Sequence, residues 1–423
     1  MQTANGGDYN VAVGALPLYS NTTGDNNVAV GPTAMFSNTT GSNNTAVGNN
    51  ALRDNTTGVS NVAIGVGALK NNATRTHNVA VGDSALFNND NGLPPLSGET
   101  PAPTGYYNTA MGSKALYTNS SGYMNTAIGH QALNDNASGE RNTAMGVYSL
   151  TNSTGGSNTA VGSSALEMNT TGDGNTAVGE SALWLATGNA EYNTGVGYSA
   201  GSSLTTARYN TAIGFSTLDN NTTGHNNTAI GRSAGPSVDG LGNTTALGYD
   251  ARPTATNMVR IGNTLVTSIG GQVGWTTVSD ARYKRDVRTD VSGLDFIMAL
   301  RPVTYTFDLP ALRQFRNEGT EFDKEGNVVR VADPDMEAAL SEQQGVRQTG
   351  FLAQEVEQAA KRSGFDFSGV DAPRNEDSLY GLRYAEFVVP LVKAVQEQQA
   401  RIDAQQREIE LLQQQVQELL IPR

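Results

Sequence analysis

The amino-acid sequence repeats itself about every 17 residues over its first 250 positions. A pentapeptide of the type Asn-Thr-Ala-Val-Gly returns fourteen times between Asn10 and Gly248. Its closing glycine falls at Gly14, Gly31, Gly48, Gly65, Gly82, Gly112, Gly129, Gly146, Gly162, Gly179, Gly197, Gly214, Gly231 and Gly248. A fixed period of this length is typical of repeat proteins, in which each unit packs only on its neighbours. The period therefore favours a rod over a globular enzyme with a pocket.

Each repeat combines a short strand, a second apolar pair and a turn. In residues 44–48 the β-branched Thr45 and Val47 flank the small Ala46, which predicts a strand with one bulky and one flat face. The pair Ala51-Leu52 follows, and an Asn-Thr-Thr-Gly turn closes the repeat. These segments make one coil of a β-solenoid, and fourteen coils about 4.8 Å apart would give a rod of roughly 65–70 Å.

The repeats at 10–248 resemble the head repeats of trimeric autotransporter adhesins, although their period is longer. That resemblance implies a left-handed parallel β-roll that trimerises. One repeat also carries only about two bulky inward residues, too few for a stout core within one chain, so we expect burial between chains. The step from Gly82 to Gly112 contains a proline-rich insertion at 90–104, which is either a binding loop or a tolerated insertion.

Composition excludes several functional classes. The chain has no cysteine, and its three histidines, His77, His130 and His225, lie in the repeats without a metal-site spacing, so we expect exposed turn residues, no metal and no cofactor. A net charge of −13 argues against a nucleic-acid partner. No apolar run is long enough for membrane insertion, and no secretory signal is visible. The repeat begins almost at once, so we expect any anchor to lie elsewhere.

Charge density changes near residue 250 and marks a domain boundary. Residues 1–250 carry 7 Lys and Arg and 15 Asp and Glu, whereas the remaining 173 residues carry 20 and 25. We expect a repeat shaft over 1–250 and a β-rich neck over 251–278. Trp275, at the end of that neck, is expected to pack the junction.

Four sequence blocks follow the neck. They are Ser279–Val287, Leu294–Tyr305, Gly350–Glu357 and Leu382–Leu391. Together they closely resemble the intramolecular chaperone domain at the C-terminus of phage tail spikes and fibres, the endosialidase type, from Ser279 to the end of the chain. The resemblance implies an α+β domain over 279–387 that folds its parent as a trimer and then cuts itself off.

The same resemblance implies the site residues. The scissile bond would be Val278–Ser279, with Ser279 as the nucleophile, Lys284 as its general base, and Asp280 in a structural role such as capping the turn. A serine hydroxyl needs a neighbouring base, and a lysine can serve as one when burial favours its neutral form. No histidine lies in this half of the chain, which excludes a Ser-His mechanism there. Related domains can keep the fold without processing, so cleavage stays open.

The C-terminal segment over 388–423 has a strict heptad. Its a positions are Val388, Val395, Ile402, Ile409 and Val416, and its d positions are Leu391, Gln398, Gln405, Leu412 and Leu419. β-branched a positions with two polar d layers predict a short coiled coil, for which we expect three strands. The charged, aperiodic stretch Ala311–Gly345 is expected to be a loop excursion.

The predicted fold is mostly β: a trimeric parallel β-solenoid shaft, an α+β chaperone domain and a trimeric coiled coil. The predicted function is a homotrimeric tail-fibre-like structural or adhesion protein, located on a virion tail or a cell-surface fibre, with a receptor or glycan as its partner. A bacterial surface stalk that retains its C-terminal domain as a trimerisation cap is the main alternative. A glycan-degrading tail spike is less favoured, because residues 1–250 show no recurrent acid pair or aromatic cleft.

Overall fold

In a computed structural model of the chain, the described residues are 7–90, 104–322, 328–330 and 334–420. They form two compact units. The first unit comprises residues 1–263 together with 313–333, and the second comprises 264–312 with 334–423. The chain therefore leaves the first unit after the repeats and returns to it once.

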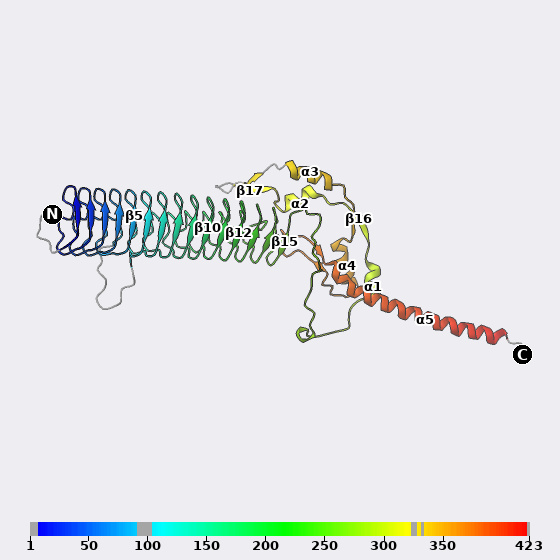
Figure 1. The fold of residues 1–423 in the computed structure, drawn as a ribbon. Helices are drawn as coiled ribbons and strands as arrows, with labels where there is room; N and C mark the ends of the chain where they lie inside the picture. The colour runs from blue at the N-terminus through cyan, green and yellow to red at the C-terminus, as the bar shows by residue number, and fades with distance from the viewer. Residues whose placement is uncertain (1–6, 91–103, 323–327, 331–333, 421–423) are drawn as a thin grey trace. The chain divides into compact units, whose positions relative to one another are not determined.

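The first unit is a parallel β-solenoid (Figure 1). One strand per coil builds a single sheet in sequence order. The strands are β1 (Val11–Val13), β2 (Val28–Val30), β3 (Thr45–Val47), β4 (Val62–Ile64), β5 (Val79–Val81), β6 (Thr109–Met111), β7 (Thr126–Ile128), β8 (Thr143–Met145), β9 (Thr159–Val161), β10 (Thr176–Val178), β11 (Thr194–Val196), β12 (Thr211–Ile213), β13 (Thr228–Ile230), β14 (Thr245–Leu247) and β15 (Val259–Ile261). Neighbouring strands pair in register, so that Ala46 lies beside Ala63. The solenoid is thus confirmed, and β15 extends it beyond the last pentapeptide.

The core of the solenoid closes within a single chain. Ala46 of the strand and the pair Ala51 and Leu52 of the opposite wall are fully buried, and the corresponding residues of the other coils are buried with few exceptions. The opposite wall is also stacked by backbone hydrogen bonds, such as Leu52 N to the Ala68 carbonyl at 2.9 Å. The expectation that one chain could not close this core is wrong, because small alanines bring the two walls close enough for one leucine per coil to fill the space.

The bulky face of each strand lies on the outside. The aliphatic side chains at the fourth motif position are half-buried or exposed, for example Ile64 at 40%, Met111 at 44% and Ile230 at 41%. The alternation therefore predicted the strand correctly, but the expectation of about two bulky inward residues per repeat is wrong, because the alanine face of the strand is inside and its bulky face is outside. The outer face of the sheet is a column of Thr or Val beside a column of aliphatic residues.

The motif glycines allow the coils to approach closely. All fourteen have φ between +100° and +145°, which L-residues rarely adopt. A Cβ atom at Gly48 would lie 2.4 Å from the carbonyl oxygen of Gly65 in the next coil. The pentapeptide thus ends in glycine for both a conformational and a steric reason.

Buried asparagines form two ladders along the solenoid. Asn55 donates from Nδ2 to Asn38 Oδ1 at 2.8 Å and to the Gly58 carbonyl at 3.1 Å, which joins one coil to the previous one and closes its own turn. The motif residue Asn44 donates from Nδ2 to the Gly58 carbonyl, and its backbone N–H donates to Asn27 Oδ1. The turn asparagine is therefore an interior hydrogen-bonding residue and not only a residue that tolerates a tight reversal.

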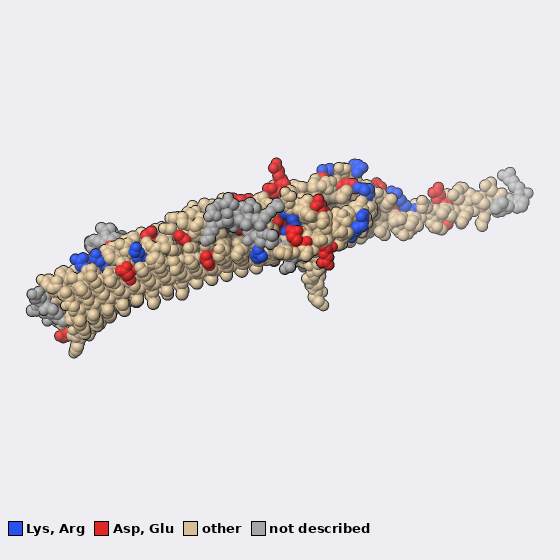
Figure 2. All heavy atoms as spheres, turned by 90° about the horizontal axis from the view of Figure 1, so that it is seen from above, with Lys and Arg blue, Asp and Glu red and all other residues tan. Residues whose placement is uncertain are grey.

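Other sequence expectations for the shaft have mixed outcomes. His77, His130 and His225 are exposed and lie outside the strands, as expected. Most of the insertion at 90–104 lies outside the described residues, but Asp90 at its edge forms an ion pair with Arg75 at 3.8 Å. On the visible face of the repeat unit, Lys and Arg are scattered and form no basic stripe (Figure 2).

The second unit contains mainly helices. Residues 264–278 hold no strand although all of them are described, and Trp275 is 89% exposed, so the packing role expected for it is wrong within this chain.

The elements that follow in the chain are η1 (Ala281–Tyr283), α1 (Leu294–Ala299), β16 (Val303–Tyr305), α2 (Leu309–Phe315), β17 (Thr320–Phe322), β18 (Val328–Arg330), α3 (Pro334–Gln343), β19 (Gln348–Gly350), α4 (Ala353–Arg362), β20 (Val370–Asp371), β21 (Gly381–Leu382), η2 (Tyr384–Phe387) and α5 (Val388–Leu420). Strands β16 and β19 pair antiparallel, as do β20 and β21.

An aromatic cluster holds the second unit together. Phe296 of α1, Val356 of α4 and Phe387 of η2 are buried around Phe367, whose ring centroid is 4.8 Å from that of Phe387. The first turns of α5 pack on α1, where Glu397 accepts a hydrogen bond from the backbone N–H of Leu294 at 2.8 Å. The last three of the four blocks singled out in the sequence thus contribute to one core.

The stretch 311–345 is not a plain loop excursion. It contains most of α2, the antiparallel pair β17–β18 and all of α3, and its residues 313–333 belong to the first unit. Glu318 of this stretch is buried, and it forms an ion pair with Arg260 of the solenoid.

Two further absences concern the part of the chain that the structure describes. None of its helices combines the length and the hydropathy that crossing a bilayer requires. Nor do these residues include a group of three or more His, Asp or Glu side chains arranged to hold a metal ion.

The asparagine ladder leads to a test of shaft stability. Replacing Asn55 with Ala removes three hydrogen bonds, including the one that its Oδ1 accepts from Asn72 Nδ2 at 3.4 Å, and leaves Asn38 Oδ1 without this donor inside the solenoid. Asn55→Ala should therefore lower the free energy of unfolding by about 1–3 kcal/mol. Denaturant unfolding followed by circular dichroism measures the change. Thr57→Ala, in the same turn but exposed, is the control and should change stability little. Equal stability of the two variants would contradict a structural role for the ladder.

Candidate functional site

The residues predicted to cleave the chain lie close together in the second unit. Ser279 and Lys284 flank η1, a single helical turn that folds the chain back on itself. The Lys284 Nζ donates a hydrogen bond to Ser279 Oγ at 2.8 Å. A separation of five residues therefore becomes a direct contact between the hydroxyl and the amine.

Asp280 fixes this turn. Its Oδ1 accepts a hydrogen bond from the backbone N–H of Arg282 at 2.9 Å, which is an N-cap of η1, and its Oδ2 accepts one from Arg282 Nη2 at 2.6 Å. These hydrogen bonds from Arg282 lower the pKa of the Asp280 carboxyl. Asp280 therefore caps this turn in the structure.

The arrangement provides a nucleophile and a base at an accessible peptide bond. Hydrogen-bond distance between a serine hydroxyl and a lysine amine is the geometry that activation of the nucleophile requires. Val278 is 85% exposed, and Ser279 and Lys284 are also exposed. A lysine accepts a proton only when its amine is neutral, and burial favours that form. This chain alone does not supply the burial.

A second group of functional interest, missed by sequence analysis, lies at the C-terminal end of the solenoid. Arg252 is fully buried, and its guanidinium forms ion pairs with Asp219 at 2.8 Å and Asp250 at 2.9 Å. Burial by itself would lower the pKa of Arg252, but the two carboxylates outweigh it and raise the pKa above its usual value. Arg252 therefore keeps its charge inside the protein, whereas burial raises the pKa of the Asp219 carboxyl despite the nearby guanidinium.

Residues from beyond the predicted cleavage point complete this cluster. Arg252 Nη2 donates to the Thr320 carbonyl at 3.0 Å, and the Gly319 N–H donates to Asp250 Oδ2. Glu318, also buried, forms an ion pair with Arg260 of β15 at 3.6 Å. We call residues 317–320 the end cover. In the sequence, Arg252 stands out as an arginine among repeats rich in Asn, Gly and Ser. Its partner Thr320 lies 68 residues away, so the sequence alone did not reveal the contact.

Helix α5 presents an uncovered apolar stripe. The a positions Val395, Ile402 and Ile409 are 63%, 48% and 48% exposed. At the start of the helix, an apolar hollow of about 310 Å³ is lined by Val388, Leu391, Val392, Val395 and Gln396. Apolar side chains at this spacing are the contact residues of a coiled coil, and no other segment of the described chain covers them.

Comparison with known proteins identifies one segment. Residues 279–365 match the Peptidase_S74 family model, whose description is chaperone of endosialidase. The match confirms the resemblance for these residues, and it begins at Ser279. It ends before β20, so α5 lies outside it. No curated protein matches the chain.

Replacing Arg252 tests how much the buried ion-pair cluster stabilises the end of the solenoid. Arg252→Leu leaves two carboxylates buried without their counter-charge, and breaking a buried ion pair in this way typically costs about 3–5 kcal/mol. We expect a lower unfolding midpoint of the solenoid in denaturant. Arg53→Leu removes an exposed arginine whose ion pair with Asp54 spans 3.8 Å, and it should change stability by at most about 1 kcal/mol. Similar stability losses in both variants would contradict the role of the buried cluster.

Proposed function

With residues 279–365 matched to the chaperone of endosialidase, we propose that the chain is a tail-fibre-like protein that assembles as a homotrimer and then cleaves its own Val278–Ser279 bond. A β-solenoid shaft in front of such a chaperone domain fits a phage tail-fibre-like protein. The single observation that carries the cleavage proposal is the 2.8 Å contact between Lys284 Nζ and Ser279 Oγ.

The proposed reaction has two steps. The amine of Lys284 takes the hydroxyl proton while Ser279 Oγ attacks the carbonyl carbon of Val278. The Val278–Ser279 C–N bond then breaks, the Ser279 nitrogen takes up the proton and becomes an amine, and Val278 is held as an ester on Oγ. Water hydrolyses this ester, which frees the Val278 carboxylate and restores the serine hydroxyl.

Trimer formation would make the reaction conditional on assembly. Both reacting side chains are exposed in the single chain, so neighbouring chains would have to exclude water and favour the neutral amine. The apolar stripe of α5 supports an assembly of this kind, because exposed a and d residues gain from burial against other copies. Cleavage would then report that a trimer has formed.

One observation favours the alternative, in which the C-terminal part stays as a permanent cap. The end cover follows the cleavage point in sequence, yet its residues pair with Arg252, Asp250 and Arg260 inside the first unit. Cutting the Val278–Ser279 bond leaves these buried contacts intact. The C-terminal fragment would therefore remain bound to the shaft after cleavage, which reconciles processing with a retained cap.

The cleavage proposal predicts a fragment that begins at Ser279. Wild type should separate into residues 1–278 and 279–423 on a denaturing gel, with the small fragment identified by N-terminal sequencing. Ser279→Ala removes the nucleophile and Lys284→Ala removes the base, so each should leave the chain intact. Thr277→Ala, which removes a hydroxyl just before the bond, is the control and should cleave like wild type. An intact wild-type chain that is trimeric would contradict cleavage and leave the cap.

The assembly proposal predicts that charge in the heptad stripe separates the chains. Ile402→Asp and Ile409→Asp together should convert a trimer into monomers, because carboxylates cannot be buried unpaired in a coiled-coil seam. Light scattering coupled to size-exclusion chromatography gives the mass directly. Ala404→Asp adds a carboxylate outside the a and d positions and should leave the trimer unchanged. A monomeric wild type would contradict the assembly proposal itself.

A further inference from the structure

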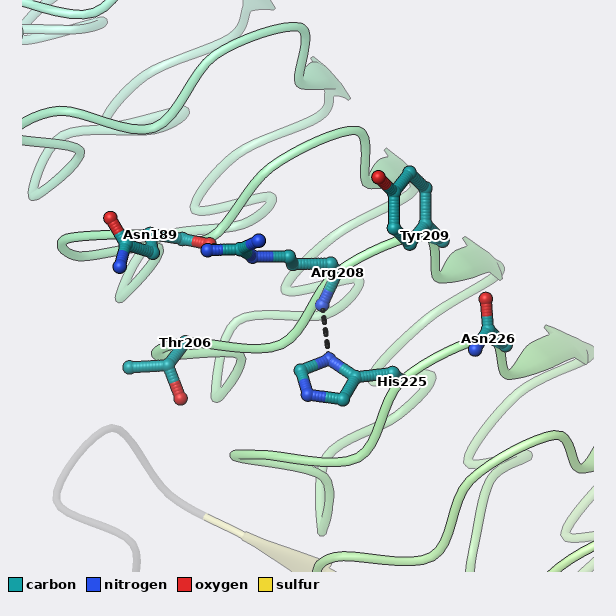
Figure 3. A pocket seen from close by; sticks show the side chains of 6 residues that line it. All are labelled: Asn189, Thr206, Arg208, Tyr209, His225 and Asn226. Atoms are coloured by element: carbon teal, nitrogen blue, oxygen red, sulfur yellow. Dashed lines mark hydrogen bonds between the residues drawn. The ribbon is translucent and has the colours of Figure 1, made fainter.

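The outer surface of the shaft has a polar hollow beside strands β11 to β13. Its volume is about 500 Å³. It is lined by Asn189, Thr206, Arg208, Tyr209, His225 and Asn226 (Figure 3). The lining combines one aromatic ring with amide, hydroxyl, guanidinium and imidazole groups. Its volume lies within the range of pockets that bind small ligands.

Tyr209 lines this hollow, and Tyr192 of the previous coil stacks on it. The rings of Tyr192 and Tyr209 are parallel within 3°, with centroids 5.4 Å apart, and the two residues are 53% and 55% exposed. At the other end of the same strands, Tyr198 and Phe215 stack at 5.3 Å and are also exposed. Among the fourteen repeats, only these two carry an aromatic residue at both ends of the strand. Aromatic rings are thus concentrated on two neighbouring coils.

The tyrosines occupy an unfavourable backbone conformation. Tyr192 and Tyr209 have φ of +56° and +59°, in the left-handed region that disfavours bulky residues. The same left-handed backbone recurs at this position in other coils, for example at Ser60, Met124 and Arg141. The conformation therefore belongs to the coil, and Tyr192 and Tyr209 differ in being neighbours whose rings stack.

The polar groups of the hollow are held in place and nearly balanced in charge. Arg208 Nε donates to the Asn189 carbonyl at 2.9 Å, and its guanidinium lies 3.7 Å from the Glu191 carboxylate. The Arg208 N–H donates to His225 Nδ1 at 3.0 Å (Figure 3), so in the neutral ring Nε2 carries the hydrogen and can donate to a ligand. Because a carboxylate offsets the guanidinium, the hollow offers hydrogen bonds without a strong field.

We propose that this hollow binds a neutral oligosaccharide of pyranose units. One face of a pyranose ring presents C–H groups that pack on an aromatic ring, while its hydroxyls need donors and acceptors at the edge. Tyr209 supplies the ring face, Tyr192 supports it by stacking, and Asn226, Thr206 and His225 supply the polar groups. This inference names the ligand class for the shaft and rests on its proposed role in a receptor-binding fibre.

The test is binding of defined sugars to the full-length protein. An array of immobilised cello-, malto- and chito-oligosaccharides provides the neutral probes, and oligosaccharides of uronic acids provide the anionic ones. Titration calorimetry on the strongest probe then gives the dissociation constant. The variants are Tyr209→Asn and Tyr192→Asn, because Asn suits the left-handed backbone and should preserve the coil. The matched control is Tyr107→Asn, which has the same place in its repeat, φ of +58° and 52% exposure, but does not line this hollow.

We expect wild type to bind at least one neutral oligosaccharide, Tyr209→Asn to weaken that binding by about tenfold or more, and Tyr107→Asn to bind like wild type. Three outcomes would overturn the proposal: no binding of any neutral probe, equal binding by wild type and both hollow variants, or binding of anionic probes alone.

Oligomeric mass and cleavage, measured on the same samples, separate this inference from the proposed function. A trimer that binds no sugar overturns the sugar site alone, whereas a monomer that binds sugar overturns only the assembly. If Tyr209→Asn lowers the oligomeric mass, the tyrosines face another copy of the chain, and the sugar site is overturned.

Discussion

The close approach of one coil to the next is the constraint on which the shaft depends. Successive strands pair in register, and each motif glycine lies so near the following one that a Cβ at Gly48 would meet a carbonyl oxygen at 2.4 Å. The same spacing sets the buried asparagines in line, so that an amide in one coil satisfies an amide in the previous coil. A solenoid with small alanines inside cannot rely on apolar volume alone, and buried hydrogen bonds between neighbours supply the specificity of the stack.

The last strand of a stacked parallel sheet has no neighbour on its outer side. The last strand exposes unpaired backbone groups, which invite pairing with other chains. Here the repeats give way to a charged cluster around Arg252, and the end cover supplies hydrogen bonds and ion pairs to it. Because the end cover comes from the sequence after Val278, the part of the chain that follows the proposed cleavage point also takes part in the fold of the shaft. The last coils of the solenoid therefore depend on contacts with residues of the C-terminal part.

Several features of the candidate sites could be predicted from the sequence, and others could not. Ser279, Asp280 and Lys284 were found from a local motif, and the turn that brings them together is equally local. The heptad repeat of α5 could also be predicted from the sequence, because all of its positions lie within one helix. The end cover was expected to be a loop, since the partners of Glu318 and Thr320 are far away in sequence. The stacked pair Tyr192 and Tyr209 belongs to neither motif, and its meaning depends on coils being neighbours.

The sequence by itself determined the period, the number of pentapeptide coils, the strand position in each coil and the identity of the chaperone segment. Each of these features depends on residues that are close together in the chain. Only the tertiary structure decided that alanine faces the core and the aliphatic residue faces outward, since alternation is symmetric with respect to the two faces of a strand. It also decided that a buried arginine contacts a distant segment and that a tyrosine stacked on its neighbour lines a hollow. Those features arise between coils, where distance in space no longer follows distance in sequence.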